Sequence, residues 1–173
     1  MVQFTPISRK PRYMKISAEC PHCQHSFMDE KNPIKGIPSI SLQFQLPEEA
    51  SGKKGIVHLS SYFGDYLNVT PFEVPEGIIG EFSCPFCGKS INNVQSCDLC
   101  NAPMVDLQLE RGGMLEYCLE AFKRRLKKKP SEMALKGLLQ FCSRRGCKKH
   151  LIEFKNQEAD LKEFYMAYSK FLE

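Results

Sequence analysis

Two Cys-x-x-Cys pairs stand only nine residues apart in the stretch CPFCGKSINNVQSCDLC, residues 84–100. A third pair lies upstream in Cys20-Pro-His-Cys23, and a looser pair lies downstream in Cys142-Ser-Arg-Arg-Gly-Cys147. Two thiolates at the close spacing can meet one ion from a single tight turn. The architecture depends on whether the two pairs in 84–100 share one ion or belong to two different sites.

The number of cysteines favours metal ligands over disulfides. The 173-residue chain has nine cysteines, an odd number, and six of them fall into Cys-x-x-Cys pairs. No run of eighteen apolar residues is present, and the basic N-terminal stretch is not followed by the apolar segment of a signal peptide. We therefore expect a cytoplasmic protein with no membrane partner, in a reducing compartment where disulfides do not persist.

Alternating apolar and polar residues predict several strands. Residues 40–46 alternate with a period of two, a second strand begins at 56–59, and residues 78–82 lead directly into the second cysteine pair. Residues 34–83 are thus expected to form a small β meander between the first two pairs. The alternation at 104–109 predicts a further strand.

The apolar period changes to a helical one in the basic part of the chain. Apolar residues recur at helical spacing from Leu115 to Leu126, and residues 133–140 are typical of a second short helix. Together they predict a helical insertion at 114–140. Leucine and aromatic residues repeat among charged ones over 156–173, which predicts an amphipathic C-terminal helix that packs on the sheet.

The second half of the chain resembles a known family. Cys97-Asp-Leu-Cys100-Asn-Ala-Pro-Met104, a strand with a Gly turn, and Phe141-Cys142-Ser-Arg-Arg-Gly-Cys147-Lys148 are similar to the four-cysteine zinc ribbons at the C-termini of bacterial type I DNA topoisomerases. The resemblance covers about thirty residues once the insertion is set aside. The insertion has no counterpart in that pattern, and Arg144-Arg145-Gly146 stands where those ribbons usually have a Tyr-Pro turn.

This resemblance implies that one ion is held by Cys97, Cys100, Cys142 and Cys147. A first site is then left to Cys20, Cys23, Cys84 and Cys87. The rival arrangement joins the two pairs of 84–100 through a small hairpin that turns at Asn92-Asn93, and the outer pairs then meet each other. We favour the sequential arrangement, in which the stretch 84–100 supplies one half of each site.

The expected fold is a small metal-stabilised α+β structure with two zinc ribbons, a β meander, a helical insertion and a C-terminal helix. Its parts are a lead-in at 1–17, a first ribbon with the meander at 18–92, a second ribbon at 93–155 and the helix at 156–173. Two zinc ions are expected as cofactors. Iron is the alternative at the first site, because similar cysteine turns hold iron in rubredoxin-like proteins.

Other candidate side chains receive structural interpretations. Cys118 lies in the predicted insertion without a partner pair, so we expect a buried apolar residue. His22, His25 and His150 are expected at the surface or beside a completed site, because four cysteines already complete a tetrahedron.

The expected function is binding rather than catalysis. Four-thiolate sites leave no open position for water or substrate, and no catalytic residues are predicted. Residues 111–150 carry twelve Lys and Arg against three Asp and Glu, whereas the rest of the chain has a net charge of −5. The candidate partner-binding residues are Lys123, Arg124, Arg125, Lys127, Lys128, Lys129, Arg144, Arg145, Lys148 and Lys149. Their charge predicts a nucleic acid or an acidic protein surface as the partner. The alternatives are an accessory or assembly subunit of a larger complex and an iron electron carrier.

Overall fold

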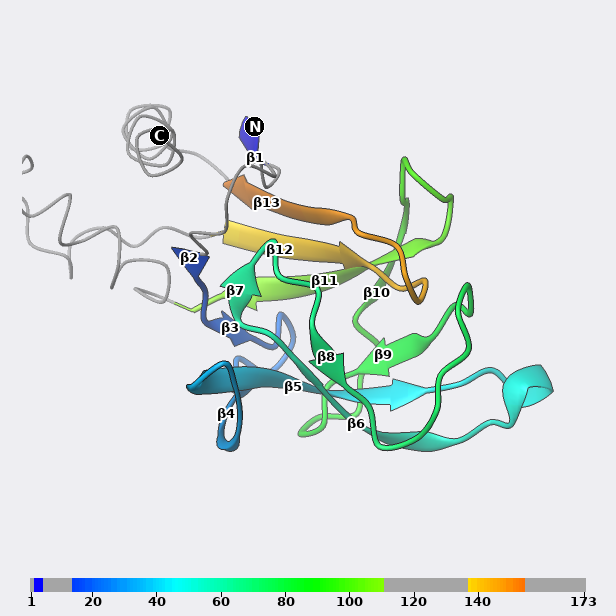
Figure 1. Cartoon of the computed structure of the whole chain (residues 1–173). Helices are drawn as coiled ribbons and strands as arrows, with labels where there is room; N and C mark the ends of the chain where they lie inside the picture. The colour runs from blue at the N-terminus through cyan, green and yellow to red at the C-terminus, as the bar shows by residue number, and fades with distance from the viewer. Residues whose placement is uncertain (1, 5–13, 111–136, 155–173) are drawn as a thin grey trace, which may run out of the picture.

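The computed structural model describes residues 2–4, 14–110 and 137–154, which form two main antiparallel sheets and a two-stranded ribbon (Figure 1). In chain order the strands are β1 (Val2–Phe4), β2 (Met14–Lys15), β3 (Ala18–Glu19), β4 (Met28–Ile34), β5 (Ile37–Gln45), β6 (Lys54–Leu59), β7 (Tyr62–Phe63), β8 (Asn68–Val69), β9 (Glu81–Ser83), β10 (Asn92–Ser96), β11 (Pro103–Leu109), β12 (Gly137–Cys142) and β13 (His150–Phe154). The 3-10 turn η1 (Glu48–Ala50) is the one helical segment of the described residues.

The six-stranded sheet is built around β11. Its order is β1-β13-β12-β11-β10, and β3 also pairs with β11. One edge of β11 pairs with β12 over residues 104–108. The other edge is shared, because β10 pairs near residues 103–105 and β3 pairs at 108–109.

The five-stranded sheet repeats this plan around β5. Its order is β4-β5-β6-β8, with β9 also paired to β5. One edge of β5 pairs with β6 over residues 40–45, and the other edge is shared between β4 at 37–40 and β9 at 43–45. Each sheet therefore has a long central strand whose second edge is completed by two short strands from different parts of the chain.

One hydrophobic core lies between the sheets, which form two layers in Figure 1. It joins Leu42 and Phe44 of β5 to Leu107 of β11 and to Leu139 and Phe141 of β12. The aromatic contacts continue through the layer, because Phe82 of β9 lies 5.0 Å from the Phe44 ring and 5.2 Å from the Phe141 ring. The predicted first and second ribbons thus share a single core.

The strand predictions are confirmed in three places. Residues 40–46, 56–59 and 104–109 correspond to β5, β6 and β11. The strand predicted at 78–82 is shorter and later, because β9 covers 81–83. Ile79 instead forms an isolated bridge with Arg144.

The predicted α+β fold class is wrong, because the described residues form an almost entirely β structure. Residues 137–140, assigned to the helical insertion, lie in β12, which is paired on both edges, with β11 and with β13. The apolar residues of GLLQFC fit the period of a helix as well as that of a strand. Pairing on both edges provides hydrogen-bond partners for the backbone N–H and C=O groups of a strand here. The rest of the predicted insertion and the predicted C-terminal helix at 156–173 lie outside the described residues.

The ribbon β2-β7 joins the N-terminal segment to the loop after β6, with Met14 opposite Phe63 and Lys15 opposite Tyr62. Among the residues that the structure describes, none belongs to a helix long and apolar enough to cross a membrane.

Candidate metal centres

The structure brings eight cysteines together in two groups of four. The first centre consists of Cys20, Cys23, Cys84 and Cys87, and the second centre consists of Cys97, Cys100, Cys142 and Cys147. Within each group all sulfur atoms lie within 4.8 Å of one another. The cysteine pairs therefore meet in the sequential arrangement, and each group can hold one metal ion.

The sulfur separations suit a tetrahedral metal. The Sγ atoms are 3.9 Å apart for Cys20 and Cys87 and 3.7 Å apart for Cys23 and Cys84. In the second centre the corresponding distances are 3.8 Å for Cys97 and Cys147 and 3.3 Å for Cys100 and Cys142. A tetrahedron with metal–sulfur bonds of about 2.3 Å has sulfur atoms about 3.8 Å apart. A disulfide would need about 2.05 Å.

Three of the four cysteine turns share one backbone geometry. The residue after the second cysteine has a positive φ, which is 60° at Gln24, 72° at Gly88 and 62° at Asn101. The N–H groups of these residues donate to the carbonyl oxygens of Cys20, Cys84 and Cys97 at 2.9, 2.9 and 2.8 Å. This bond closes the turn, so that both side chains of the pair can reach one ion.

The fourth turn has two more residues and reaches the same result. Cys142 donates its N–H to the carbonyl oxygen of Lys149 at 3.2 Å, two residues beyond Cys147, as in the shorter turns. The extra length is taken up at Gly146, whose φ is 87°. The loose Cys-x4-Cys spacing is therefore compatible with one site.

Backbone N–H groups also contact the sulfur atoms. The N–H groups of His22, Phe86 and Arg144 donate to the Sγ atoms of Cys20, Cys84 and Cys142, each at 3.4 Å. Hydrogen bonds to a thiolate favour its charged form. These contacts fit sulfur atoms that carry negative charge.

The first centre lies where the chain passes between the two sheets. The turn of Cys20 and Cys23 connects β3 of the six-stranded sheet to β4 of the five-stranded sheet. The turn of Cys84 and Cys87 connects β9 of the five-stranded sheet back to β10 of the six-stranded sheet. A metal ion here would clamp both crossings together.

The second centre lies within one sheet. Its turns connect β10 to β11 and β12 to β13, all in the six-stranded sheet. Its buried cysteines pack with Ala102 and Met104 in a small cluster of their own. A metal ion here would join the ends of two neighbouring hairpins.

Protonation of the thiols depends on their burial. Burial raises the pKa of Cys84 to about 12 and also raises the pKa of Cys142. The backbone N–H of Lys89 lowers the pKa of Cys87 to about 7. Burial opposes ionisation of Cys100, yet hydrogen bonds led by the N–H of Ala102 lower its pKa to about 6. A cation is needed before all four thiols of a centre lose their protons at neutral pH.

The three candidate histidines stand outside both sulfur groups. The His22 Nε2 atom lies 3.1 Å from the carbonyl oxygen of Ser90, and the His25 ring stacks on Phe86 at 4.7 Å. His150 accepts a hydrogen bond at Nδ1 from the N–H of Gly64 at 3.2 Å, and its ring stacks on Phe63. Burial lowers the pKa of His150 to about 4, so the ring is neutral at pH 7.

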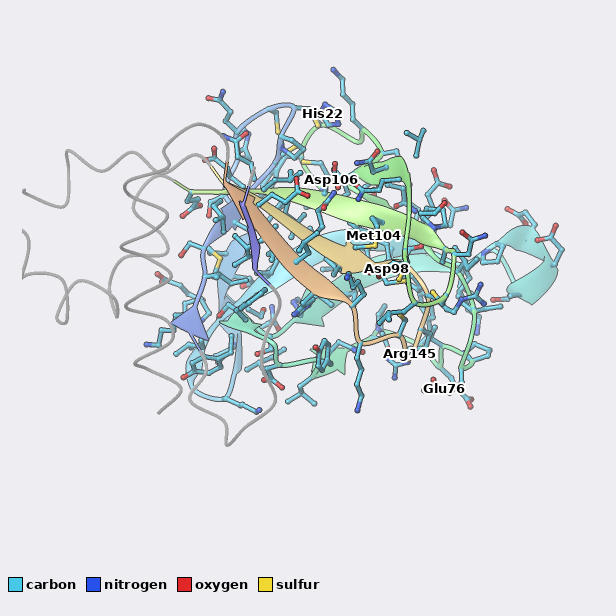
Figure 2. All side chains as sticks on the ribbon, turned by 90° about the horizontal axis from the view of Figure 1, so that it is seen from above. His22, Glu76, Asp98, Met104, Asp106 and Arg145 are labelled. Carbon is cyan, nitrogen blue, oxygen red and sulfur yellow. The ribbon has the colours of Figure 1, made fainter. Side chains whose placement is uncertain are left out.

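Four of the ten candidate partner-binding residues are described, and three of these have partners inside the chain. The side chain of Arg144 donates to the carbonyl oxygens of Gly77 and Cys100 at 2.8 and 3.5 Å. Arg145 contacts Asn68 and Glu76, which lies beside it in Figure 2, and Lys149 contacts Asp98 at 2.9 Å. Lys148 is exposed. Lys123, Arg124, Arg125, Lys127, Lys128, Lys129 and Cys118 lie outside the described residues.

One element of the second centre is absent from the sequence-based prediction. The segment 75–80 runs along the turn of Cys142 and Cys147, with hydrogen bonds from Gly77 N to Arg145 O at 3.1 Å and from Gly80 N to Ser143 O at 3.2 Å. No local pattern predicts this pairing, because the two segments lie more than sixty residues apart. In the sequence, Gly77 and Gly80 are the feature that indicates a close backbone contact at this segment.

A scan of the chain against protein-family models finds no match, and searches of curated proteins and of solved structures find no match either. No family match therefore supports the resemblance to topoisomerase ribbons. The functional conclusion rests on the geometry of the two centres.

Proposed function

We propose that this protein is a non-enzymatic binding module whose β fold is held together by two structural zinc ions. The observation that supports it is the pair of closed four-cysteine groups, with sulfur separations that fit a tetrahedral ion. Four thiolates fill a tetrahedral zinc ion and leave no position for water or substrate. Such sites stabilise folds and do not activate substrates.

The experiment is metal analysis with a visible absorption spectrum, on protein purified without added metal. Two zinc ions per chain and a colourless protein are the expected result. Iron with thiolate charge-transfer bands would replace the proposal with an electron carrier. The iron alternative concerns the first centre, where the hydrogen bonds from backbone N–H groups to the sulfur atoms of Cys20 and Cys84 suit iron and zinc equally.

We place the binding function on the basic segment 123–129, together with exposed Lys148, and propose nucleic acid or an acidic protein surface as the partner. Six of the seven residues of this segment are Lys or Arg. Clustered cations displace the counterions of a phosphate backbone, so affinity should fall steeply with salt. Arg144, Arg145 and Lys149 would add positive potential while keeping their contacts within the chain.

A labelled single-stranded oligonucleotide tests this at two salt concentrations. The variant with Lys127, Lys128 and Lys129 changed to Gln should bind more weakly and with a shallower salt dependence, by about 0.7 in log–log slope for each lost phosphate contact. The matched control changes the exposed lysines Lys31, Lys53 and Lys54 to Gln. Absence of binding at low salt excludes nucleic acid and leaves the acidic protein partner, which a pull-down with the same variants tests.

A second candidate function is that of an assembly subunit. Three apolar side chains near the cysteine turns are exposed, namely Phe86 at 58%, Val94 at 100% and Leu99 at 66%. Exposed apolar side chains of this size often mark protein contacts when they lie together. Changing all three to Ser should abolish co-purification of a partner without changing the zinc content.

A further inference from the structure

A cavity of about 350 Å³ lies between the two sheets and opens beside the second centre. Its inner wall is apolar and takes side chains from both layers, among them Phe44 and Leu59 of the five-stranded sheet and Leu107 and Phe141 of the six-stranded sheet. Pockets that hold small ligands range from about 300 to 1,000 Å³ and are mostly apolar with a few polar groups. This cavity has the size and the wall of such a pocket.

The opening of the cavity has a different chemistry. Four cationic residues line it, all from the turn that follows β12: Arg144, Arg145, Lys148 and Lys149. The exposed side chains of Tyr66 and Leu67, at 36% and 48%, form an apolar part of the rim. An apolar interior therefore ends at a positively charged edge.

The acidic residues of the lining already have cationic or hydroxyl partners. Asp65 lies 2.8 Å from the Lys35 Nζ atom and accepts a hydrogen bond from Ser60 at 2.7 Å. Glu76 lies 3.7 Å from Arg145. Among the described residues, neither Arg144 nor Lys148 forms an ion pair with a carboxylate.

Arg144 supplies the second observation. Its Nε atom is buried and has no hydrogen-bond acceptor among the described residues, although its terminal nitrogens bind carbonyl oxygens. A buried donor without an acceptor costs free energy, and more so when it is charged. Arg144 therefore brings to the cavity lining a positive charge that its contacts with carbonyl oxygens do not neutralise.

We propose that the cavity binds an amphiphilic monoanion, a molecule with an apolar chain or ring system and one carboxylate. The apolar body lies between the sheets against Phe44, Leu59 and Phe141. The carboxylate lies at the rim with Arg144 and Lys148. This site goes beyond the proposed partner binding, since it takes a small molecule between the sheets and shares only Lys148 with the proposed partner-binding residues of segment 123–129 and Lys148.

The test uses the full chain with both zinc ions and the fluorescent probe 8-anilinonaphthalene-1-sulfonate, an aromatic monoanion. We expect saturable binding of one probe per chain, and displacement of the probe by decanoate. Decanamide has the same chain without the charge and should displace the probe at least tenfold less effectively. Absence of saturable probe binding, or equal displacement by decanoate and decanamide, would overturn the proposal.

Two variants locate the site. Leu59→Trp fills the cavity and should weaken decanoate binding at least tenfold, whereas Ile56→Trp, on the same strand and outside the lining, should leave it unchanged. Decanoate binding that is the same in wild type and Leu59→Trp would place the ligand elsewhere and contradict the proposal.

The charge at the rim is tested separately. Lys148→Gln should weaken decanoate binding several-fold and leave decanamide binding unchanged. The matched control Lys53→Gln removes an exposed lysine that does not line the cavity.

A reporter variant keeps the test independent of whether Leu59→Trp folds. The chain contains no tryptophan, so Leu67→Trp at the exposed rim gives a single fluorophore. Its emission should shift on addition of decanoate with the same concentration dependence as probe displacement. An unchanged emission at saturating decanoate would contradict the proposal. Because nucleic-acid binding is measured on the Lys127–Lys129 variant, failure of one proposal is distinguishable from failure of the other.

Discussion

Arg145 donates its backbone N–H to the carbonyl oxygen of Ile78 at 2.8 Å. This bond and the return bond from Gly77 hold the segment 75–80 against the metal-binding turn of Cys142 and Cys147. Glu76 and Ile78 in that segment also line the cavity. The metal-binding turn of the second centre and one wall of the cavity are therefore parts of the same local structure.

Loss of the second metal should loosen this segment. Cys147→Ser should lower the number of bound metal ions from two to one and increase amide hydrogen exchange at Gly77 and Gly80, because the turn that receives their N–H groups is no longer fixed. Mass spectrometry of the intact protein and of exchanged peptides measures both effects. Cys118→Ser, a thiol outside the two groups of four, is the control and should change neither. Unaltered exchange at 75–80 in Cys147→Ser would disprove the coupling.

Loss of the first metal should have a wider effect. Of the two centres, the first joins turns that connect the two sheets, whereas the second joins turns within one sheet. Cys84→Ser should therefore unfold both sheets, since the first centre holds both crossings between them. Cys142→Ser should leave the five-stranded sheet folded. Circular dichroism after zinc loading separates the two variants, and equal spectra would contradict the assignment of a clamp to the first centre.

Substitution of Gly88, which follows Cys87, tests backbone strain alone, because an added Cβ atom would make no contact. Gly88 has a φ of 72°, and a Cβ atom there would meet no atom within 4 Å. Gly88→Ala should cost about 1–2 kcal/mol of unfolding free energy through left-handed strain alone. Gly88→Asn should cost less, because Asn101 already occupies the equivalent position of another turn. Denaturant titration with excess zinc gives both values; a Gly88→Ala protein as stable as wild type would be against this interpretation.

A polar network across β10, β11 and β12 should contribute to stability. The buried side chain of Gln140 donates from Nε2 to Asp106 at 2.8 Å, and Asn93 donates to the other carboxylate oxygen at 2.7 Å. Asp106→Ala should destabilise the protein by about 1–3 kcal/mol, because one N–H of the buried Gln140 amide loses its acceptor while the other still donates to Gln95 at 3.2 Å.

The double variant with Asp106→Leu and Gln140→Leu removes both partners and should recover part of that loss. Chemical denaturation of the single and double variants gives the coupling energy. Additive losses would mean that the two side chains do not depend on each other.

His150 should make stability fall in mild acid. Its folded pKa of about 4 lies below the usual value near 6.5, because burial disfavours the charged ring and outweighs the attraction of Asp65. Below pH 6.5 the unfolded chain therefore takes up a proton that the folded chain does not. This contribution to stability is present above pH 6.5 and is lost as the pH falls toward 4.

The measurement is the difference in unfolding free energy between wild type and His150→Gln at pH 7.5 and 5.5, with zinc in excess. Relative to the variant, wild type should lose about 1 kcal/mol over this range. The comparison cancels proton uptake by the cysteines, which both proteins share. An equal pH dependence in the two proteins would show that His150 is not the group responsible.

The strands with a clear alternation and the cysteine turns could be predicted from the sequence. Residues 40–46 bury every second side chain, so burial alone determines their structure. The turns are specified locally by cysteine spacing and by a residue that accepts positive φ. Both kinds of signal lie within a few neighbouring residues.

The parts that depend on distant pairing could not be predicted. Leu138 and Leu139 fit a helix as well as a strand, and the choice is made by backbone bonds to β11, about thirty residues earlier. Buried Gln140 looks like a solvent-facing helix residue until Asp106 is seen beside it. The sharing of β5 and β11 between partners from different parts of the chain has no local signal either.

The crossings at the first centre also bear on how the chain folds during synthesis. Cys20 and Cys23 emerge more than sixty residues before Cys84 and Cys87, so for that interval they are a two-thiol site with low metal affinity and exposed to oxidation. β3, immediately before them, lacks its partner until residues 108–109 have been made. The N-terminal end of the described fold is thus completed only after the ribosome has passed into the second half of the chain, and until then the first cysteine pair depends on the cell to keep its thiols reduced.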